Sequence, residues 1–190
     1  KDAMGIDNIE RREKEITDYV MDNLEQNDQV VMLESHIKDR LAIVSFYVRG
    51  AHHNLVVRLL NDKFGVQTRG GCSCAGTYGH ILLNVDHDTS NKITEQINSG
   101  DYAEKPGWIR ASFHPTMSDK EIAFVVDAIN QVTENIEQWS KEYRFNPATG
   151  DFEHQQSAVK FPSLQDFNPL SEKNSKSSIS HGSFLGKLFG

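Results

Sequence analysis

The 190-residue chain contains only two cysteines, no long run of apolar residues and no long run of basic residues. So few cysteines are typical of a protein in a reducing compartment. No apolar segment is long enough to span a bilayer, and the chain begins without a signal-peptide pattern. The net charge of −7 and the lack of a basic run make nucleic acid and anionic lipid poor partners. We therefore expect a cytoplasmic protein that binds neither nucleic acid nor a membrane.

The pattern of apolar residues predicts one domain in which helices and strands alternate. A chain of this length can bury a single sizeable core. Helices are predicted where apolar residues recur every three or four positions, and strands where short runs are rich in β-branched and aromatic residues. The expected helices cover residues 6–24, 52–64, 89–98 and 118–139, and the expected strands cover residues 30–33, 41–48, 66–69 and 108–113.

The order of these elements predicts a fold of the α/β (α+β-like) class, in which helices cover one face of a short mixed or antiparallel sheet. The polar connection "ESHIKDR" is short enough to make the first two strands antiparallel neighbours. Ser118 and Glu121 have the spacing of a capping box at the start of the last helix. We expect residues 1–145 to form the folded domain. Residues 146–190 are expected to be a weakly ordered tail, because sustained periodicity is lost there.

Both cysteines lie in the stretch "QTRGGCSCAGTYGH". A structural zinc site needs four ligands, normally with wider spacing than one C-x-C. The set available for zinc is Cys72, Cys74, His80 and His87. A disulfide across a single residue would close a small strained ring, and a buried inert thiol is the ordinary alternative. Arg69 and the surrounding glycines instead favour a reactive-thiol loop, because a positive charge stabilises a thiolate.

Two motifs carry a resemblance to a known family. "GVQTRGGCSCAG" is similar to a desulfurase strand and loop that reads Arg-x-Gly-x-x-Cys-Ala-x-Pro, and "GWIRASFHPTMSDKEIAFVVDAI" resembles a substrate-arginine strand followed by the last helix. The matching positions are Arg69, Gly71, Cys74, Ala75 and Arg110. The chain from about residue 6 to residue 132 thus resembles the small C-terminal domain of class V aminotransferases and cysteine desulfurases, pyridoxal-phosphate enzymes of fold type I.

The resemblance implies a pyridoxal 5'-phosphate-dependent transferase or lyase that acts on a small amino acid. Arg110 would hold the substrate carboxylate through a bidentate pair. In desulfurase members, a cysteine at the place of Cys74 attacks the substrate sulfur, retains a persulfide and leaves alanine. Arg69 would position the substrate or stabilise the thiolate. His80 would either reach the substrate or cofactor or make a structural hydrogen bond. The family also implies a homodimer.

The chain departs from the family pattern at several positions. Thr77 replaces the proline of the loop motif, and Cys72 and Ser73 replace a histidine pair, so Cys72 is a rival nucleophile or a resolving thiol. The Schiff-base lysine and the phosphate-binding residues lie, in this family, in a large domain that precedes the small one, and no matching motif is found here. We expect a fragment that is inactive without its own N-terminal large domain. The alternative is a catalytically silent module that uses Cys74 and Cys72 for redox sensing or metal binding.

A few single residues outside these motifs carry simpler expectations. His52 and His53, at the start of a predicted helix, are expected to cap it or to be exposed. Trp108 is expected to be part of the core. The lysines in polar surroundings are expected to be solvated rather than catalytic. They are Lys14, Lys38, Lys63, Lys92 and Lys105.

Overall fold

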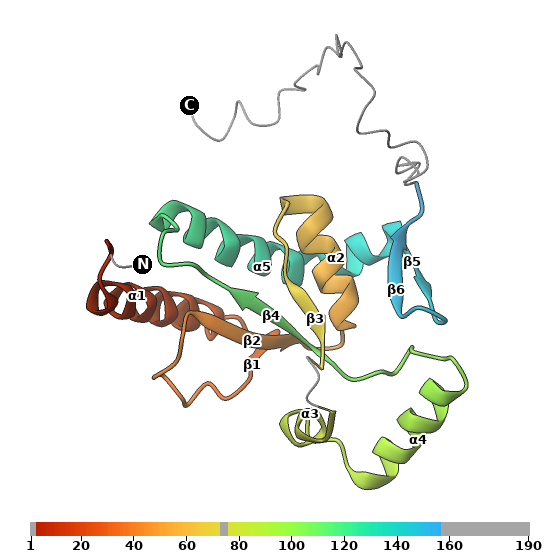
Figure 1. Ribbon diagram of the computed structural model, residues 1–190. Coiled ribbons are helices and arrows are strands. Elements are labelled where there is room, and N and C mark those ends of the chain that lie inside the picture. Colours follow the sequence, from red (N-terminus) through yellow and green to blue (C-terminus); the bar gives the residue numbers. More distant parts are fainter. Residues whose placement is uncertain (1–2, 73–75, 157–190) are drawn as a thin grey trace, which may run out of the picture. The chain divides into compact units, whose positions relative to one another are not determined.

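The computed structural model describes residues 3–72 and 76–156 (Figure 1). The helices are α1 (Ile6–Leu24), α2 (His53–Phe64), α3 (Gly76–Leu82), α4 (His87–Asn98), α5 (Asp119–Trp139) and the 3-10 helix η1 (Ser140–Glu142). The strands are β1 (Val30–Met32), β2 (Ile43–Val48), β3 (Arg69–Gly71), β4 (Trp108–Ser112), β5 (Tyr143–Asn146) and β6 (Asp151–His154). Among these elements, no helix combines the length and the hydropathy of a membrane span.

The main sheet has four strands in the order β1-β2-β4-β3, and every neighbouring pair is antiparallel. The prediction that the first two strands are antiparallel neighbours is therefore confirmed. Successive side chains of a strand point to opposite faces of the sheet. In β2 the side chains of Val44, Phe46 and Val48 are buried, whereas that of Ile43, the first residue of the strand, is exposed. The sheet thus has one core face and one open face, and the open face is the one that carries Ile43.

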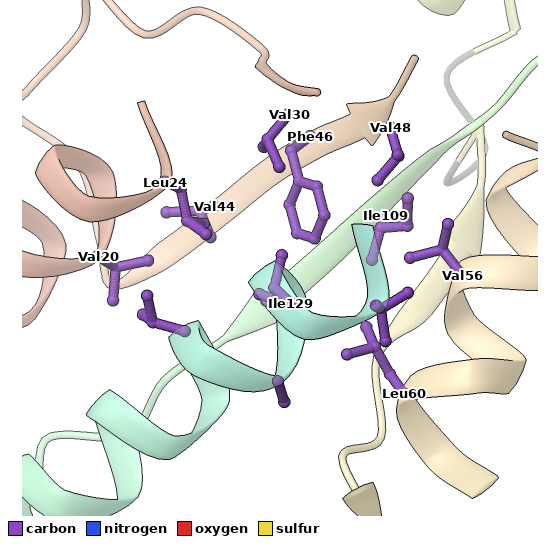
Figure 2. Close-up of a cluster of buried hydrophobic side chains, with 14 of the residues drawn as sticks. Val20, Leu24, Val30, Val44, Phe46, Val48, Val56, Leu60, Ile109 and Ile129 are labelled. Atoms are coloured by element: carbon purple, nitrogen blue, oxygen red, sulfur yellow. The ribbon is translucent and has the colours of Figure 1, made fainter. Parts of the chain in front are cut away.

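Helices α1, α2 and α5 pack against the core face of the sheet (Figure 1). Figure 2 shows how side chains from helices and strands meet there. The labelled side chains are Val20, Leu24, Val30, Val44, Phe46, Val48, Val56, Leu60, Ile109 and Ile129. Truncating a fully buried residue of this core, such as Phe46, would cost about 3–5 kcal/mol of stability. The predicted α/β class, with helices covering one face of a short antiparallel sheet, is confirmed.

Local signals at the helix ends also appear as predicted. Ser118 Oγ accepts a hydrogen bond from the Glu121 backbone N–H at 3.3 Å, and the Ser118 backbone N–H donates to Glu121 Oε2 at 2.8 Å. These two bonds satisfy amide groups that the first turn of a helix leaves without partners. Gly65 ends α2 in the left-handed conformation with φ of 67°, which a residue without Cβ adopts at little cost.

Three expectations about the chain need correction. The third strand is residues 69–71 rather than 66–69, and α3 was not predicted because it follows the cysteine loop directly. The tail was expected to begin at residue 146, but residues 143–154 form the β5–β6 hairpin. The period-two signal of two four-residue strands is too short to detect in the sequence. The hairpin is nevertheless stabilised by contact with α2, because Tyr143 Oη donates a hydrogen bond to Asp62 Oδ2 at 3.0 Å.

Candidate functional site

Three polar side chains form one row across the open face of the sheet. Arg110 in β4 is paired in register with Ser45 in β2 on one side and with Arg69 in β3 on the other. Residues directly opposite one another in antiparallel strands project to the same face, with Cβ atoms about 5 Å apart. Arg69 is exposed and Arg110 is half-buried. The topology therefore places two arginine side chains at neighbouring positions on a face that otherwise carries apolar and small residues.

The side chain of neither arginine has a hydrogen-bond or ion-pair partner among the described residues. The side chains of the other described arginines each form a hydrogen bond or an ion pair with an oxygen atom, as Arg58 does with Asp62 and Arg49 with the Asp28 carbonyl. They are Arg11, Arg12, Arg40, Arg49, Arg58 and Arg144. Nε of Arg110 is moreover buried without a partner. A buried donor that lacks an acceptor costs free energy, and two like charges repel. The missing partner that the geometry calls for is an anion.

Cys72 lies directly after β3 and is held by the segment that enters β4. Its Sγ donates a hydrogen bond to the Pro106 carbonyl oxygen at 2.7 Å. Burial raises the pKa of the Cys72 thiol, and the nearby charge of Lys105 opposes this effect only in part. A neutral thiol that already donates a hydrogen bond is a poor nucleophile. The surroundings of Cys72 favour a structural role over the predicted attack on substrate.

Cys74, the other predicted catalytic cysteine, lies outside the described residues. Helix α3 begins two positions later, and its Gly79 lies against the Trp108 side chain at the start of β4. A Cβ added to Gly79 would come within 3.1 Å of the Trp108 ring and 3.7 Å of Cys72 Sγ. Cys72 and Gly79 of α3 therefore lie close to one another beside Trp108. Trp108 is buried, as predicted.

His80 takes part in a hydrogen bond that joins two helices. Its Nδ1 lies 2.9 Å from Ser90 Oγ, which ties α3 to α4. This is the structural hydrogen bond that was one of the two alternatives for His80. Within residues 3–72 and 76–156, no recorded hydrogen bond or ion pair links His80 to Arg69 or Arg110. Its role in substrate binding stays a prediction.

The histidine pair at the start of α2 lies on the core side of the sheet. His52 caps the helix, because its Nδ1 accepts a hydrogen bond from the Asn54 backbone N–H at 3.2 Å. His53 is 5 % exposed, so the expectation of an exposed side chain is wrong for this residue. Burial, with a smaller effect from His52, lowers the pKa of His53 to about 4. The ring is therefore neutral at physiological pH and packs 4.4 Å from the His52 ring.

Sequence reasoning missed Ser45, although its signal was available. In the run "IVSFYV" the buried residues alternate with others, so Ser45 had to share a face with Ile43 rather than with Phe46. What the run could not show is that its register places Ser45 directly opposite Arg110. A metal site is not found in the described part of the chain, where no three His, Cys, Asp or Glu side chains are close enough to hold an ion. A set that includes Cys74 falls outside that part.

Comparison with known proteins shows which protein family the chain resembles. A family model described as Aminotransferase class-V matches residues 2–125. A curated protein named "Probable cysteine desulfurase", from Halobacterium salinarum, is 30% identical over 128 residues, which are 67% of this chain and 26% of that protein. The chain thus spans about a quarter of the length of this relative.

Two solved structures are also similar to the chain. The apo structure of a cysteine desulfurase from Thermococcus onnurineus NA1 has a TM-score of 0.49 and 21% identity, and the match covers 70% of this chain and 28% of that chain. The S-sulfonic acid form of the cysteine desulfurase CsdA from Escherichia coli has a TM-score of 0.44 and 17% identity, and the match covers 68% of this chain and 26% of that chain.

Proposed function

Because the chain belongs to the class V aminotransferase family, we propose that it is the small domain of a pyridoxal-phosphate-dependent enzyme that acts on a small amino acid. The domain runs to the end of the β5–β6 hairpin, and a large N-terminal domain of the same protein carries the cofactor. The complete enzyme is a homodimer. The expected family-level roles of Arg110, Arg69 and Cys74 follow from this assignment.

The observation that carries the proposal is a pair of arginines on the open face whose side chains have no partner within residues 3–72 and 76–156. Arg110 receives the substrate carboxylate, which gives its buried Nε the acceptor that the described residues do not provide. Arg69, one strand away in register, adds a second positive charge on the same side. A guanidinium group binds a carboxylate through two parallel hydrogen bonds, a geometry that lysine cannot reproduce. Together the two arginines fix the orientation of the substrate before reaction.

The described residues fit the substrate end of such a site and do not fit the cofactor end. Bound pyridoxal phosphate supplies an electron sink for the amino acid and needs a lysine for covalent attachment. The side chains that β2, β4 and β3 project to the open face include no lysine. Several lysines elsewhere are in ion pairs, as Lys14 is with Asp18 and Lys63 with Glu142. The attachment site is therefore assigned to the large domain.

We assign the reactive thiol to Cys74. In the proposed reaction its thiolate attacks the sulfur of L-cysteine held by Arg110, so that a sulfur–sulfur bond forms while the carbon–sulfur bond breaks. The electron pair of the broken bond stays with the substrate carbon, which takes up a proton to give alanine. The transferred sulfur remains on Cys74 as a persulfide. The assignment is supported by the resemblance of the loop and by the name of the curated relative.

The proposal is tested on the full-length protein that contains this chain. The protein is reconstituted with pyridoxal phosphate and given L-cysteine together with dithiothreitol, which reduces the persulfide and releases its outer sulfur as sulfide. Alanine and sulfide are measured for the native protein and for Cys74→Ala, Cys72→Ala and Arg110→Lys. We expect Cys74→Ala to abolish both products, Cys72→Ala to retain them, and Arg110→Lys to raise KM. If the cofactor binds but no variant or native protein consumes cysteine, desulfurase activity is refuted. The same protein is then assayed for amino-group transfer, which does not need Cys74.

A further inference from the structure

The β5–β6 hairpin lies beyond the residues that match the family model, which end at residue 125. Its turn is nevertheless bonded to the two segments that lead to the arginine strands. The Gly150 carbonyl oxygen accepts a hydrogen bond from Asn54 Nδ2 at 2.7 Å. The Pro147 carbonyl oxygen accepts one from the Tyr102 backbone N–H at 2.9 Å. The hairpin turn thus joins the start of α2 to the segment that enters β4.

The Asn54 side chain lies next to strand β3 on the core side of the sheet. Its Oδ1 is so close to Gly70 that a Cβ on that glycine would lie 2.8 Å from it. Gly70 lies between Arg69 and Gly71 in β3 and is paired with Ile109, the neighbour of Arg110. The Asn54 side chain therefore lies between Gly150 of the hairpin turn and Gly70 of β3. One amide side chain contacts both.

The entry to β4 is held in the same way. The backbone of Gly150 packs on Tyr102, because a Cβ at Gly150 would meet Tyr102 Cβ at 3.1 Å. Further along this segment, Pro106 accepts the hydrogen bond from Cys72, and Gly107 lies against the His53 ring. The segment 102–107 is thus in contact with the hairpin at its start and with Cys72 and His53 at its end.

The hairpin is itself anchored to α2 at its base. Tyr143 Oη donates to Asp62 Oδ2 at 3.0 Å, and Lys63 Nζ lies 2.6 Å from Glu142 Oε2. The Phe145 ring packs 5.4 Å from the His52 ring. The turn at residues 147–150 is therefore fixed relative to the helix that carries Asn54.

These contacts of the hairpin turn matter because β3 is a three-residue strand at the edge of the described sheet, where its neighbour is β4. A short edge strand has few ladder hydrogen bonds to keep it in place. Like charges directly opposite one another, as in the pair Arg69 and Arg110, also destabilise a pair of strands. We propose that the β5–β6 hairpin turn, through Asn54 and Tyr102, holds β3 and β4 in register for anion binding by Arg69 and Arg110. Asn54 is then a positioning residue, and this inference rests on the proposed function.

The test measures carboxylate binding in the full-length enzyme. KM and kcat are determined with L-cysteine, and the competitive inhibition constant is determined for propionate, which has a carboxylate but no amino group. We expect Asn54→Ala to raise KM and the propionate constant by the same factor, about 3- to 10-fold, as expected for the loss of one hydrogen bond that orients a binding group. We expect kcat to change less. Asn54→Asp, which keeps the shape but loses the donor to Gly150, should act in the same direction.

Tyr143→Phe is the matched control, because it removes one hydrogen bond at the base of the hairpin, while the Lys63–Glu142 ion pair and the packing of Phe145 on His52 still hold the turn against α2. It should lower the thermal midpoint without changing KM or the propionate constant. Equal effects of Tyr143→Phe and Asn54→Ala on binding would overturn the inference, since the hairpin would then act only through general stability. Arg110→Lys separates the two proposals. If it weakens binding while both Asn54 variants do not, the positioning role is refuted and the proposed function stands; if it leaves binding unchanged, the proposed function itself is refuted.

Discussion

Arg69 and Arg110 face each other across the β3–β4 ladder, and neither has a partner among the described residues. Arginines elsewhere in the described structure bond carboxylates or backbone carbonyls, as Arg12 bonds Asp119. Two like charges at directly opposed positions, with no ion-pair partner among the described residues, destabilise a pair of strands. An anion that binds between them removes this cost, so the arrangement is better suited to binding than to stability.

The arginine pair predicts a specific stabilisation by divalent anions. Sodium sulfate should raise the free energy of unfolding of the native protein by about 1 kcal/mol at several times its dissociation constant, relative to sodium chloride at equal ionic strength. Arg69→Gln should lose most of this difference, because one of the two charges is removed. Thermal unfolding in the two salts measures it. Arg58→Gln is the control, since Arg58 forms an exposed pair with Asp62; an equal loss in this variant would show that sulfate acts nonspecifically.

We predict that position 70 must be glycine, because α2 comes so close to β3 there that a Cβ does not fit. In Gly70→Ala the new Cβ would lie 2.8 Å from Asn54 Oδ1 and 3.1 Å from Val57 Cγ2. The strand must move away from the helix, and overpacking of this kind costs about 1–3 kcal/mol. We expect a lower unfolding midpoint in urea together with a higher KM for the amino acid.

Gly65→Ala provides the comparison for this substitution. A Cβ at Gly65 meets no atom within 4 Å, and the cost comes from its φ of +67° alone. This variant should lose about 1 kcal/mol of stability and keep its KM. A normal KM in Gly70→Ala would contradict the link between that contact and Arg69.

Because His53 is buried, we predict that the free energy of unfolding decreases at acidic pH. Burial lowers the pKa of His53 from 6.5 to about 4 in the folded state, so the unfolded chain binds this proton more readily. The stability that the neutral ring contributes is fully present above pH 6.5, decreases as the pH falls, and is lost below about pH 4. Between pH 7 and pH 4.5 the loss is roughly 2–3 kcal/mol.

Urea unfolding at these two pH values checks the prediction. The variant His53→Gln carries no titrating group at this position, so its stability should depend less on pH by that amount. The variant starts from a lower stability at neutral pH, because the ring packs against Gly107. If the native protein and the variant lose the same free energy between the two pH values, other groups are responsible for the acid sensitivity.

Cys72 and Cys74 are predicted to differ in reactivity. Burial raises the pKa of the Cys72 thiol, and its hydrogen bond to Pro106 favours the neutral form. Iodoacetamide at neutral pH should therefore modify Cys74 at least tenfold faster than Cys72. Mass spectrometry of the tryptic peptide, compared between native protein and each single alanine variant, gives both rates. Cys72→Ser, which retains a donor to Pro106, should be more stable than Cys72→Ala. Faster modification of Cys72 would assign it the nucleophile's role instead.

Local features of this protein are readable from the residues themselves. The apolar period of three and four positions placed α1, α2 and α5, and the spacing of Ser118 and Glu121 predicted the capping box that the structure contains. Such features depend on neighbours within one or two turns of the chain, so a short window holds all the information. The arginines and cysteines of interest were also identified at this level, through two short motifs that resemble a family.

Contacts between distant segments were decided only by the tertiary structure. The pairing of Arg69 with Arg110, the bond from Cys72 to Pro106 and the burial of His53 each depend on contacts between segments that are far apart in sequence. The β5–β6 hairpin was missed because its strands are too short to show a period, and packing on α2 stabilises it. The residues alone supplied the two charges. Long-range pairing set them side by side, because register is fixed by the burial of a whole sheet face and not by any single motif.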